Sequence, residues 1–324
     1  MPWSARSTKK CGPSGAMNLL HSAIISSLPL VPRSLFRRIA GRYIAGETRE
    51  GLLRVVRKLH EEGLRTTVDV LGENVTSPEQ AQHAADEYRR VIQEIASAGG
   101  SPQVSVKLSL LGLRLDEKLA LDHLLEITRA ATLSGVGVFL DMEDTSTTDA
   151  TLRIYRRAHQ EFQGLGIAVQ AYLHRSVRDV LELLPLRPAI RICKGIYNEP
   201  ATLALKDRRA IQENYLKIVT LLVDGDGFPA MATHDAWLVD QCQELLRSRS
   251  VGPGSHEFQM LLGVGEGLRS RIRKAGSPLR LYCPYGPDWE AYSVRRLKEN
   301  PHMAGYIFKS VLSRRILDRG HLDP

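Results

Sequence analysis

Short apolar, β-branched runs alternate along this chain with longer segments whose apolar residues recur at helical spacing. The first helical segment covers residues 47–63 and has apolar residues at Leu52, Leu53, Val56 and Leu59. Eight strand-like runs come after it, at residues 66–71, 104–108, 136–140, 168–172, 189–193, 230–233, 258–262 and 279–283. Helical periodicity separates most of these runs, over residues 78–98, 117–134, 148–163, 201–223 and 236–247.

This alternation predicts an α/β fold in which helices cover a parallel sheet. Each run is almost continuously apolar, which is typical of strands that are buried on both faces. Eight strand–helix units in 324 residues favour a (βα)8 TIM-type barrel, and an open doubly wound sheet remains the alternative. Because no linker-like composition interrupts the chain after residue 46, we predict one catalytic barrel domain over residues 47–324.

Residues 1–46 differ from the rest of the chain in charge. The chain has a net charge of +8, and this segment holds no acidic residue, while its basic residues are Arg6, Lys9, Lys10, Arg33, Arg37, Arg38 and Arg42. We expect a basic arm that is disordered over residues 1–16 and amphipathic and helical over residues 17–44. Three interpretations stay open: a transit peptide, an arm that contacts a membrane surface, and a leader without a role.

Charge and cysteine content narrow the class of protein. The body after residue 46 is nearly neutral, which argues against nucleic-acid binding. The longest apolar run, residues 17–32, is too short and too broken by proline to span a bilayer. The four cysteines show no CxxC spacing, which favours a reducing compartment and argues against zinc. We therefore predict a cytoplasmic protein, or a protein of the mitochondrial matrix if the source is eukaryotic, with peripheral contact to the inner membrane through the arm.

One lysine stands out where the predicted strands run into their helices, which is where barrel enzymes place their chemistry. Lys107 lies inside the apolar run Val-Ser-Val-Lys-Leu-Ser-Leu. A buried lysine must find a counter-charge or lose its proton, and Asp141, at the same level of the next strand, is the expected partner. A Schiff-base aldolase with Lys107 or Lys194 as the nucleophile is therefore one candidate function.

A second cluster lies near the end of the chain, where a strand and a turn lead into a helix that begins near Pro287. Tyr292, Arg295 and Arg296 share one face of this helix, and two guanidiniums beside a phenol suit a small carboxylate or a phosphate. A non-enzymatic phosphate or nucleic-acid surface would use the same arginines. No HExxH, Walker A or GxSxG motif is present. No GxGxxG follows the first strand, and the stretch Gly-Val-Gly-Glu-Gly at residues 263–267 comes after the seventh, so we expect neither a metal site nor a Rossmann dinucleotide site.

Several short motifs, in order along the chain, resemble those of the proline dehydrogenase family. They are Val-Ser-Val-Lys-Leu-Ser (104–109), Phe-Leu-Asp-Met-Glu (139–143), Val-Gln-Ala-Tyr-Leu (169–173), Arg-Ile-Cys-Lys-Gly-Ile-Tyr (191–197), Ala-Thr-His-Asp (232–235), Glu-Phe-Gln-Met-Leu-Leu-Gly (257–263) and Tyr-Ser-Val-Arg-Arg-Leu-Lys-Glu-Asn (292–300). The resemblance implies a distorted (βα)8 barrel and oxidation of L-proline to Δ1-pyrroline-5-carboxylate by hydride transfer to N5 of FAD. It also implies a quinone-type electron acceptor, and a separate pyrroline-5-carboxylate dehydrogenase, because we expect a monofunctional enzyme.

The resemblance further implies a role for particular side chains around the substrate. Arg295 and Arg296 would bind the proline carboxylate, with Lys107 as a third cation held in place by Asp141. The pyrrolidine ring would pack against Tyr197, Tyr282, Tyr292 and Leu261, and Glu73 would close over Arg295 as a gate.

For FAD, the resemblance implies contacts from the second half of the barrel. Arg191 would lie near N5 and the pyrophosphate, and Gln170 at the isoalloxazine edge. The remaining cofactor contacts would come from Lys194, Gly195, Thr233 and His234. Two positions depart from the family pattern, Ile196 beside the substrate and Asn198 near the flavin, so the details of the pocket stay open there.

Overall fold

The computed structural model describes residues 41–72, 75–290 and 292–294. The chain divides into two compact units, one formed by Gly41–Trp289 and the other by Met1–Ala40 together with Glu290–Pro324. The first unit contains the barrel. Most of the predicted basic arm, residues 1–46, lies outside the described residues, so the arm and its boundary stay predictions.

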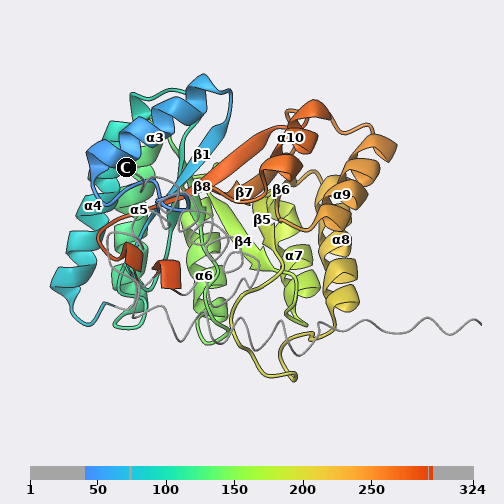
Figure 1. Ribbon diagram of the computed structural model, residues 1–324. Helices are drawn as coiled ribbons and strands as arrows, with labels where there is room; N and C mark the ends of the chain where they lie inside the picture. Colours follow the sequence, from blue (N-terminus) through green and yellow to red (C-terminus); the bar gives the residue numbers. More distant parts are fainter. Residues whose placement is uncertain (1–40, 73–74, 291, 295–324) are drawn as a thin grey trace, which may run out of the picture. The chain divides into compact units, whose positions relative to one another are not determined.

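Eight parallel strands close into a barrel in chain order, from β1 next to β2 round to β8 next to β1 (Figure 1). The strands are β1 (Arg65–Val70), β2 (Gln103–Val106), β3 (Gly137–Leu140), β4 (Gly166–Gln170), β5 (Ala189–Cys193), β6 (Phe228–Ala232), β7 (Glu257–Leu261) and β8 (Leu279–Tyr285). The closed order confirms the predicted (βα)8 barrel and excludes the open doubly wound sheet.

Helices surround the strands (Figure 1). They are α3 (Arg49–Glu61), α4 (Pro78–Ala96), α5 (Glu117–Leu133), α6 (Thr148–His159), α7 (Ser176–Leu183) with the short 3-10 turn η2 (Leu184–Leu186), α8 (Arg208–Asp224), α9 (Ala236–Ser248) and α10 (Glu266–Lys274). Within the described part of the chain, no helix is long and apolar enough to cross a membrane.

Local signals set most helix ends. Pro78 opens α4 after Ser77, whose hydroxyl accepts the backbone N–H of Gln80. The predicted helix over residues 201–223 is too long at its start, because the Asp207 side chain caps α8 by accepting the N–H of Ala210. The prediction over residues 148–163 is likewise too long, since α6 ends at His159.

The two faces of the strands differ in character. On β2, Val104 and Val106 belong to the hydrophobic core that lies between strands and helices, whereas the hydroxyl of Ser105 accepts a hydrogen bond from Arg191 of β5 at 2.6 Å. Strands that are not neighbours meet only across the barrel axis, so Ser105 and Arg191 point inward. The barrel interior is therefore polar, and the hydrophobic core forms a layer around it.

Candidate active site

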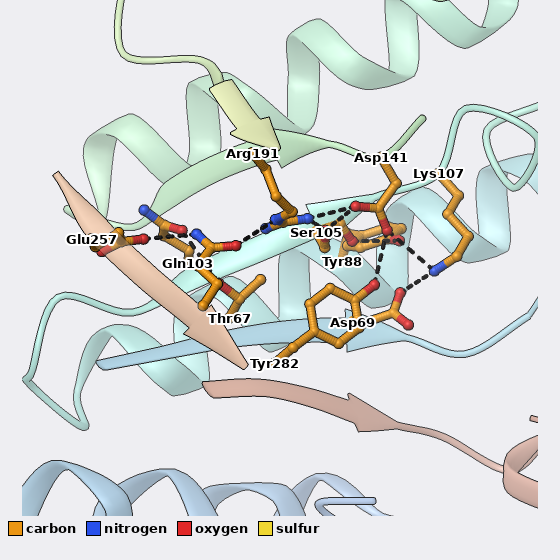
Figure 2. A network of polar contacts seen from close by, with 11 residues as sticks. Thr67, Asp69, Tyr88, Gln103, Ser105, Lys107, Asp141, Arg191, Glu257 and Tyr282 are labelled. Carbon is orange, nitrogen blue, oxygen red and sulfur yellow. Dashed lines mark hydrogen bonds and ion pairs between the residues drawn. The ribbon is translucent and has the colours of Figure 1, made fainter. Parts of the chain in front are cut away.

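Lys107 lies just after β2 at the carboxyl end of the barrel, where the predicted counter-charge is present (Figure 2). Its ammonium lies 3.6 Å from the Oδ2 atom of Asp141, after β3, and donates a hydrogen bond to Asp69 of β1. Burial disfavours the ammonium, but the attraction of Asp69, Tyr282 and Asp141 outweighs it and raises the pKa of Lys107 well above its ordinary value. Lys107 is therefore a fixed cation.

Asp141 collects donors from three other strands. Its Oδ1 atom accepts hydrogen bonds from the Ser105 hydroxyl and from Nη1 of Arg191, both at 2.6 Å, and its Oδ2 atom accepts from the Tyr282 hydroxyl at 2.8 Å. Burial alone would raise the pKa of Asp141, but Arg191 and Lys107 outweigh that effect, so the pKa is lowered. An ionised Asp141 thus joins the lysine to the arginine at the centre of the barrel.

Arg191 is 3% exposed and has one unused edge. Its Nε atom donates to Gln259 at 2.7 Å, and Nη1 donates to Ser105 and Asp141. The guanidinium carbon lies 4.9 Å from the ring centre of Phe139 and 5.4 Å from that of Tyr282. Its buried Nη2 atom has no hydrogen-bond partner among the residues that the structure describes. A buried donor without an acceptor is costly, so this edge suits a ligand that brings an acceptor.

The residues expected around FAD lie at the ends of β4, β5 and β6. Gln170 donates to the carbonyl of Glu143 at 2.9 Å, and the Lys194 ammonium lies 3.4 Å from Asp235. His234 accepts the backbone N–H of Leu261 through Nε2 at 3.0 Å, so this ring nitrogen carries no proton. The hydroxyl of Thr233 likewise accepts the N–H of Asp235, at 3.1 Å.

Gly195 lies just after β5 in a conformation that favours glycine. Its φ of +119° is rare for residues with a side chain, and an added Cβ would lie 2.1 Å from the ring of Tyr172. Glycine at this position therefore lets the half-buried backbone of residue 195 pack directly against the ring of Tyr172.

The expected substrate residues fall into two groups. Tyr282 joins the Asp141 network, Leu261 ends β7, and Tyr197 lies in the half-buried loop after β5. Glu73, Arg295 and Arg296 lie outside the described residues, and Tyr292 belongs to the second unit. Their placement around proline stays a prediction.

Other inward-facing residues were given no role from the sequence: Asp69, Ser105 and Gln259, and the buried ion pair of Glu257 with Arg280. Each of them occupies the inward position of its strand, two residues from another polar residue, as in Glu257-x-Gln259 and Ser105-x-Lys107. This polar spacing of two within otherwise apolar strands is the signal that could have identified them.

A closed (βα)8 barrel with a buried charge network at the carboxyl ends of its strands has the arrangement of a barrel enzyme, since this end is where such enzymes place their active sites. Residues 52–307 match the profile of the family described as proline dehydrogenase. The chain therefore belongs to the proline dehydrogenase family.

Individual relatives agree with this assignment. The chain is 37% identical over 275 residues to proline dehydrogenase 1 of Bacillus subtilis strain 168, covering 85% of this chain and 91% of the relative. It is 36% identical over 279 residues to a proline dehydrogenase of Deinococcus radiodurans, covering 85% and 90%. Among solved structures, proline utilization A from Bdellovibrio bacteriovorus, inactivated by N-propargylglycine, aligns with a TM-score of 0.77 and 25% identity over 88% of this chain. The chain spans 37% of the length of that structure.

Proposed function

We propose that this enzyme oxidises L-proline to Δ1-pyrroline-5-carboxylate with FAD as its cofactor and passes the electrons to a quinone-type acceptor. The observation that carries the proposal is the unpartnered, buried Nη2 edge of Arg191, among described residues, beside the network of Asp141 and Lys107. Family membership supports the same reaction.

The residues present fit a flavin. An isoalloxazine ring offers oxygen and nitrogen acceptors, which the orphaned donor of Arg191 requires. Gln170 and the backbone at Lys194 and Gly195 would hold the ring and its chain, together with Thr233 and His234. When bound, FAD supplies the acceptor for the hydride that leaves the substrate.

The remaining task of the protein is to orient proline. Arg295, Arg296 and Lys107 would fix the carboxylate at one end, so that the ring carbon beside the nitrogen faces the cofactor. The ring would pack on Tyr197, Tyr282, Tyr292 and Leu261, with Glu73 closing over Arg295.

Charge balance assigns a second role to the arginine pair. In the described barrel, Lys107 and Arg191 face the two carboxylates Asp69 and Asp141, so these four groups are close to neutral together. The substrate nitrogen must be neutral to lose hydride, and a nearby positive charge favours its neutral form. Arg295 and Arg296 would therefore supply the positive field as well as the carboxylate contacts.

One spectrum tests the proposal. Purified protein supplied with FAD should be yellow, and anaerobic addition of L-proline should bleach the flavin absorption. A protein that binds no flavin, or whose flavin does not respond to proline, contradicts the proposal.

The aldolase alternative predicts a colourless protein that borohydride inactivates in the presence of a carbonyl substrate. A Schiff-base lysine must be neutral to attack, and the raised pKa of Lys107 argues against that role.

The N-terminal arm is proposed to bring the enzyme to a membrane that holds the quinone. Its basic charge suits an anionic surface. Deletion of residues 1–44 should abolish sedimentation with anionic vesicles, and unchanged sedimentation would assign the arm no such role. The pyrroline product would pass to a pyrroline-5-carboxylate dehydrogenase.

A further inference from the structure

A chain of buried hydrogen bonds leads away from Arg191 toward the opposite end of the barrel from Lys107. Nε of Arg191 donates to Oε1 of Gln259 on β7 at 2.7 Å, and Nε2 of Gln259 donates to Oε1 of Glu257 at 2.7 Å. The same Glu257 oxygen accepts from Nε of Arg280 on β8, also at 2.7 Å. All four residues are at most 3% exposed. Figure 2 shows Glu257 on the far side of Arg191 from Lys107.

The chemistry of the partners allows Gln259 only one orientation. A carboxylate only accepts hydrogen bonds and a guanidinium only donates them. The amide nitrogen of Gln259 must therefore face Glu257, and its oxygen must face Arg191.

Glu257 is itself held firmly. Nη1 of Arg65 lies 3.2 Å from Oε2 of Glu257, while Nε of Arg280 contacts Oε1, so each carboxylate oxygen has a cation. Burial would raise the pKa of Glu257, but the attraction of Arg280 outweighs it and lowers the pKa, so the carboxylate stays ionised.

Two fixed contacts determine the direction of a planar guanidinium. Asp141 and Ser105 hold Nη1, and Gln259 holds Nε, so the remaining Nη2 edge can point in one direction only. Without Gln259, the guanidinium keeps its Nη1 hydrogen bonds and its contacts with the rings of Phe139 and Tyr282, but it loses the contact that fixes Nε and can turn within its own plane. We propose that Gln259 is a positioning residue that aims the free edge of Arg191 at the cofactor, and that Glu257 and Arg280 fix Gln259 for this purpose. The inference rests on the proposed FAD site.

The test compares Gln259→Met with Thr67→Val. Methionine keeps the length of the side chain and removes both hydrogen bonds. Thr67 is 1% exposed and donates a 3.3 Å hydrogen bond to Gln103, a residue outside the Arg191–Gln259–Glu257–Arg280 chain, so its replacement by valine is the matched control. The Kd of FAD is measured on apo-protein by quenching of flavin fluorescence, and the midpoint potential on the reloaded enzyme.

Gln259→Met should weaken FAD binding by about 10- to 100-fold, which corresponds to one hydrogen bond to a charged group, and should shift the potential. Thr67→Val should change neither. A double-mutant cycle with Arg191→Lys tests whether Gln259 acts on FAD binding through Arg191. If it does, Gln259→Met should have little further effect on the Kd once the guanidinium is gone. Equal Kd and potential in Gln259→Met and Thr67→Val, or a full effect of Gln259→Met in the Arg191→Lys background, overturns the inference.

Failure of the inference differs from failure of the proposed function. If the unmodified enzyme binds no FAD, the proposed function fails. If it binds FAD and is reduced by proline while the two variants behave alike, only the role of Gln259 fails. Should Gln259→Met not fold, Gln259→Leu replaces it: it also removes both hydrogen bonds, the one from Arg191 and the one to Glu257, and should weaken FAD binding in the same cycle.

Discussion

Lys107→Met tests whether the ammonium at the barrel rim is a structural counter-charge, a substrate contact or both. The Lys107 side chain is 14% exposed, and those of Asp69 and Asp141 are 2% and 15% exposed. Methionine has a similar length and no charge. After the change Asp141 keeps its bonds to Arg191, Ser105 and Tyr282, whereas Asp69 loses its cation.

Two opposing contributions set how much stability the Lys107→Met change removes. At 3.6 Å and an effective dielectric of about 20, the attraction between Lys107 and Asp141 is about 5 kcal/mol. Withdrawing each ion from water costs several kcal/mol, so the complete network contributes little net stability. Removal of one partner leaves the desolvation cost unbalanced, and we expect a loss of about 3–5 kcal/mol in the free energy of unfolding.

Urea unfolding measures this loss as a shift of the midpoint. Lys118→Met is the control, because Lys118 is 79% exposed and its ion pair with Asp122 should be worth less than about 1 kcal/mol. Adding Asp69→Asn to Lys107→Met should recover most of the lost stability, since it removes the orphaned carboxylate. If Lys107→Met is no less stable than Lys118→Met, no buried charge pair exists at this position.

The double variant also isolates the substrate contact. With stability restored, a raised KM for proline would assign Lys107 to carboxylate binding. An unchanged KM would refute that role and leave Lys107 to the scaffold.

Three further predictions address other parts of the site. Arg295→Met, outside the described residues, should weaken proline binding by about 2–5 kcal/mol while FAD content is unchanged; proline titration and flavin absorbance measure the two, and normal saturation by proline would mean that the carboxylate lies elsewhere. Gly195→Ala should lower the ratio of bound flavin to protein, because its Cβ would meet Tyr172 at about 1–3 kcal/mol of strain; Gly164→Ala, whose Cβ meets nothing within 4 Å, should not. Asp235→Asn removes the negative charge that lies 3.4 Å from Lys194 and 3.2 Å from Arg208, and it should cost about 1 kcal/mol near neutral pH. Burial alone would raise the pKa of Asp235 in the folded protein, but the hydrogen bond from Gln212 and the charge of Lys194 help to lower it overall. The contribution of Asp235 to stability is therefore fully present above the ordinary pKa of 3.8, and it is lost as the pH falls through the pKa of the folded protein. Unfolding curves of both proteins should therefore converge in acid, and a constant difference would mean that the negative charge of Asp235 does not stabilise the fold.

Periodicity predicted the eight strands because each strand has an apolar face against the helices, and the count of eight strand–helix units favoured a closed barrel over an open sheet. The same signal fails for short or polar helices. Neither α7, with 8 residues, nor α10, whose only buried residue is Ile272, was predicted, since neither offers enough turns of apolar repeat. Residues 201–207 were predicted as helix, but Ala204 pairs with Leu173, a tertiary contact that local pattern does not encode.

In the candidate site, too, contacts between neighbouring strands were predicted from the sequence and contacts across the barrel were not. Lys107 and Asp141 were paired because adjacent strands of a barrel present residues at the same level. The link from Arg191 on β5 to Ser105 on β2 and Gln259 on β7 joins strands that are not neighbours. Alternation identifies such residues as inward-facing, but the partner across the axis depends on the stagger of the whole barrel, which a single sequence does not reveal.

The polar interior of the barrel also has a consequence for how the chain selects its strand pairing. A shift of β7 by one residue would point Glu257 and Gln259 into the hydrophobic core between strands and helices. It would also point Phe258 and Met260 into the barrel interior. Every such misaligned barrel would bury an unmatched ion, at a penalty of several kcal/mol. The buried charges in the barrel interior therefore favour one register of the strands over the others. The same register brings together the proposed catalytic groups.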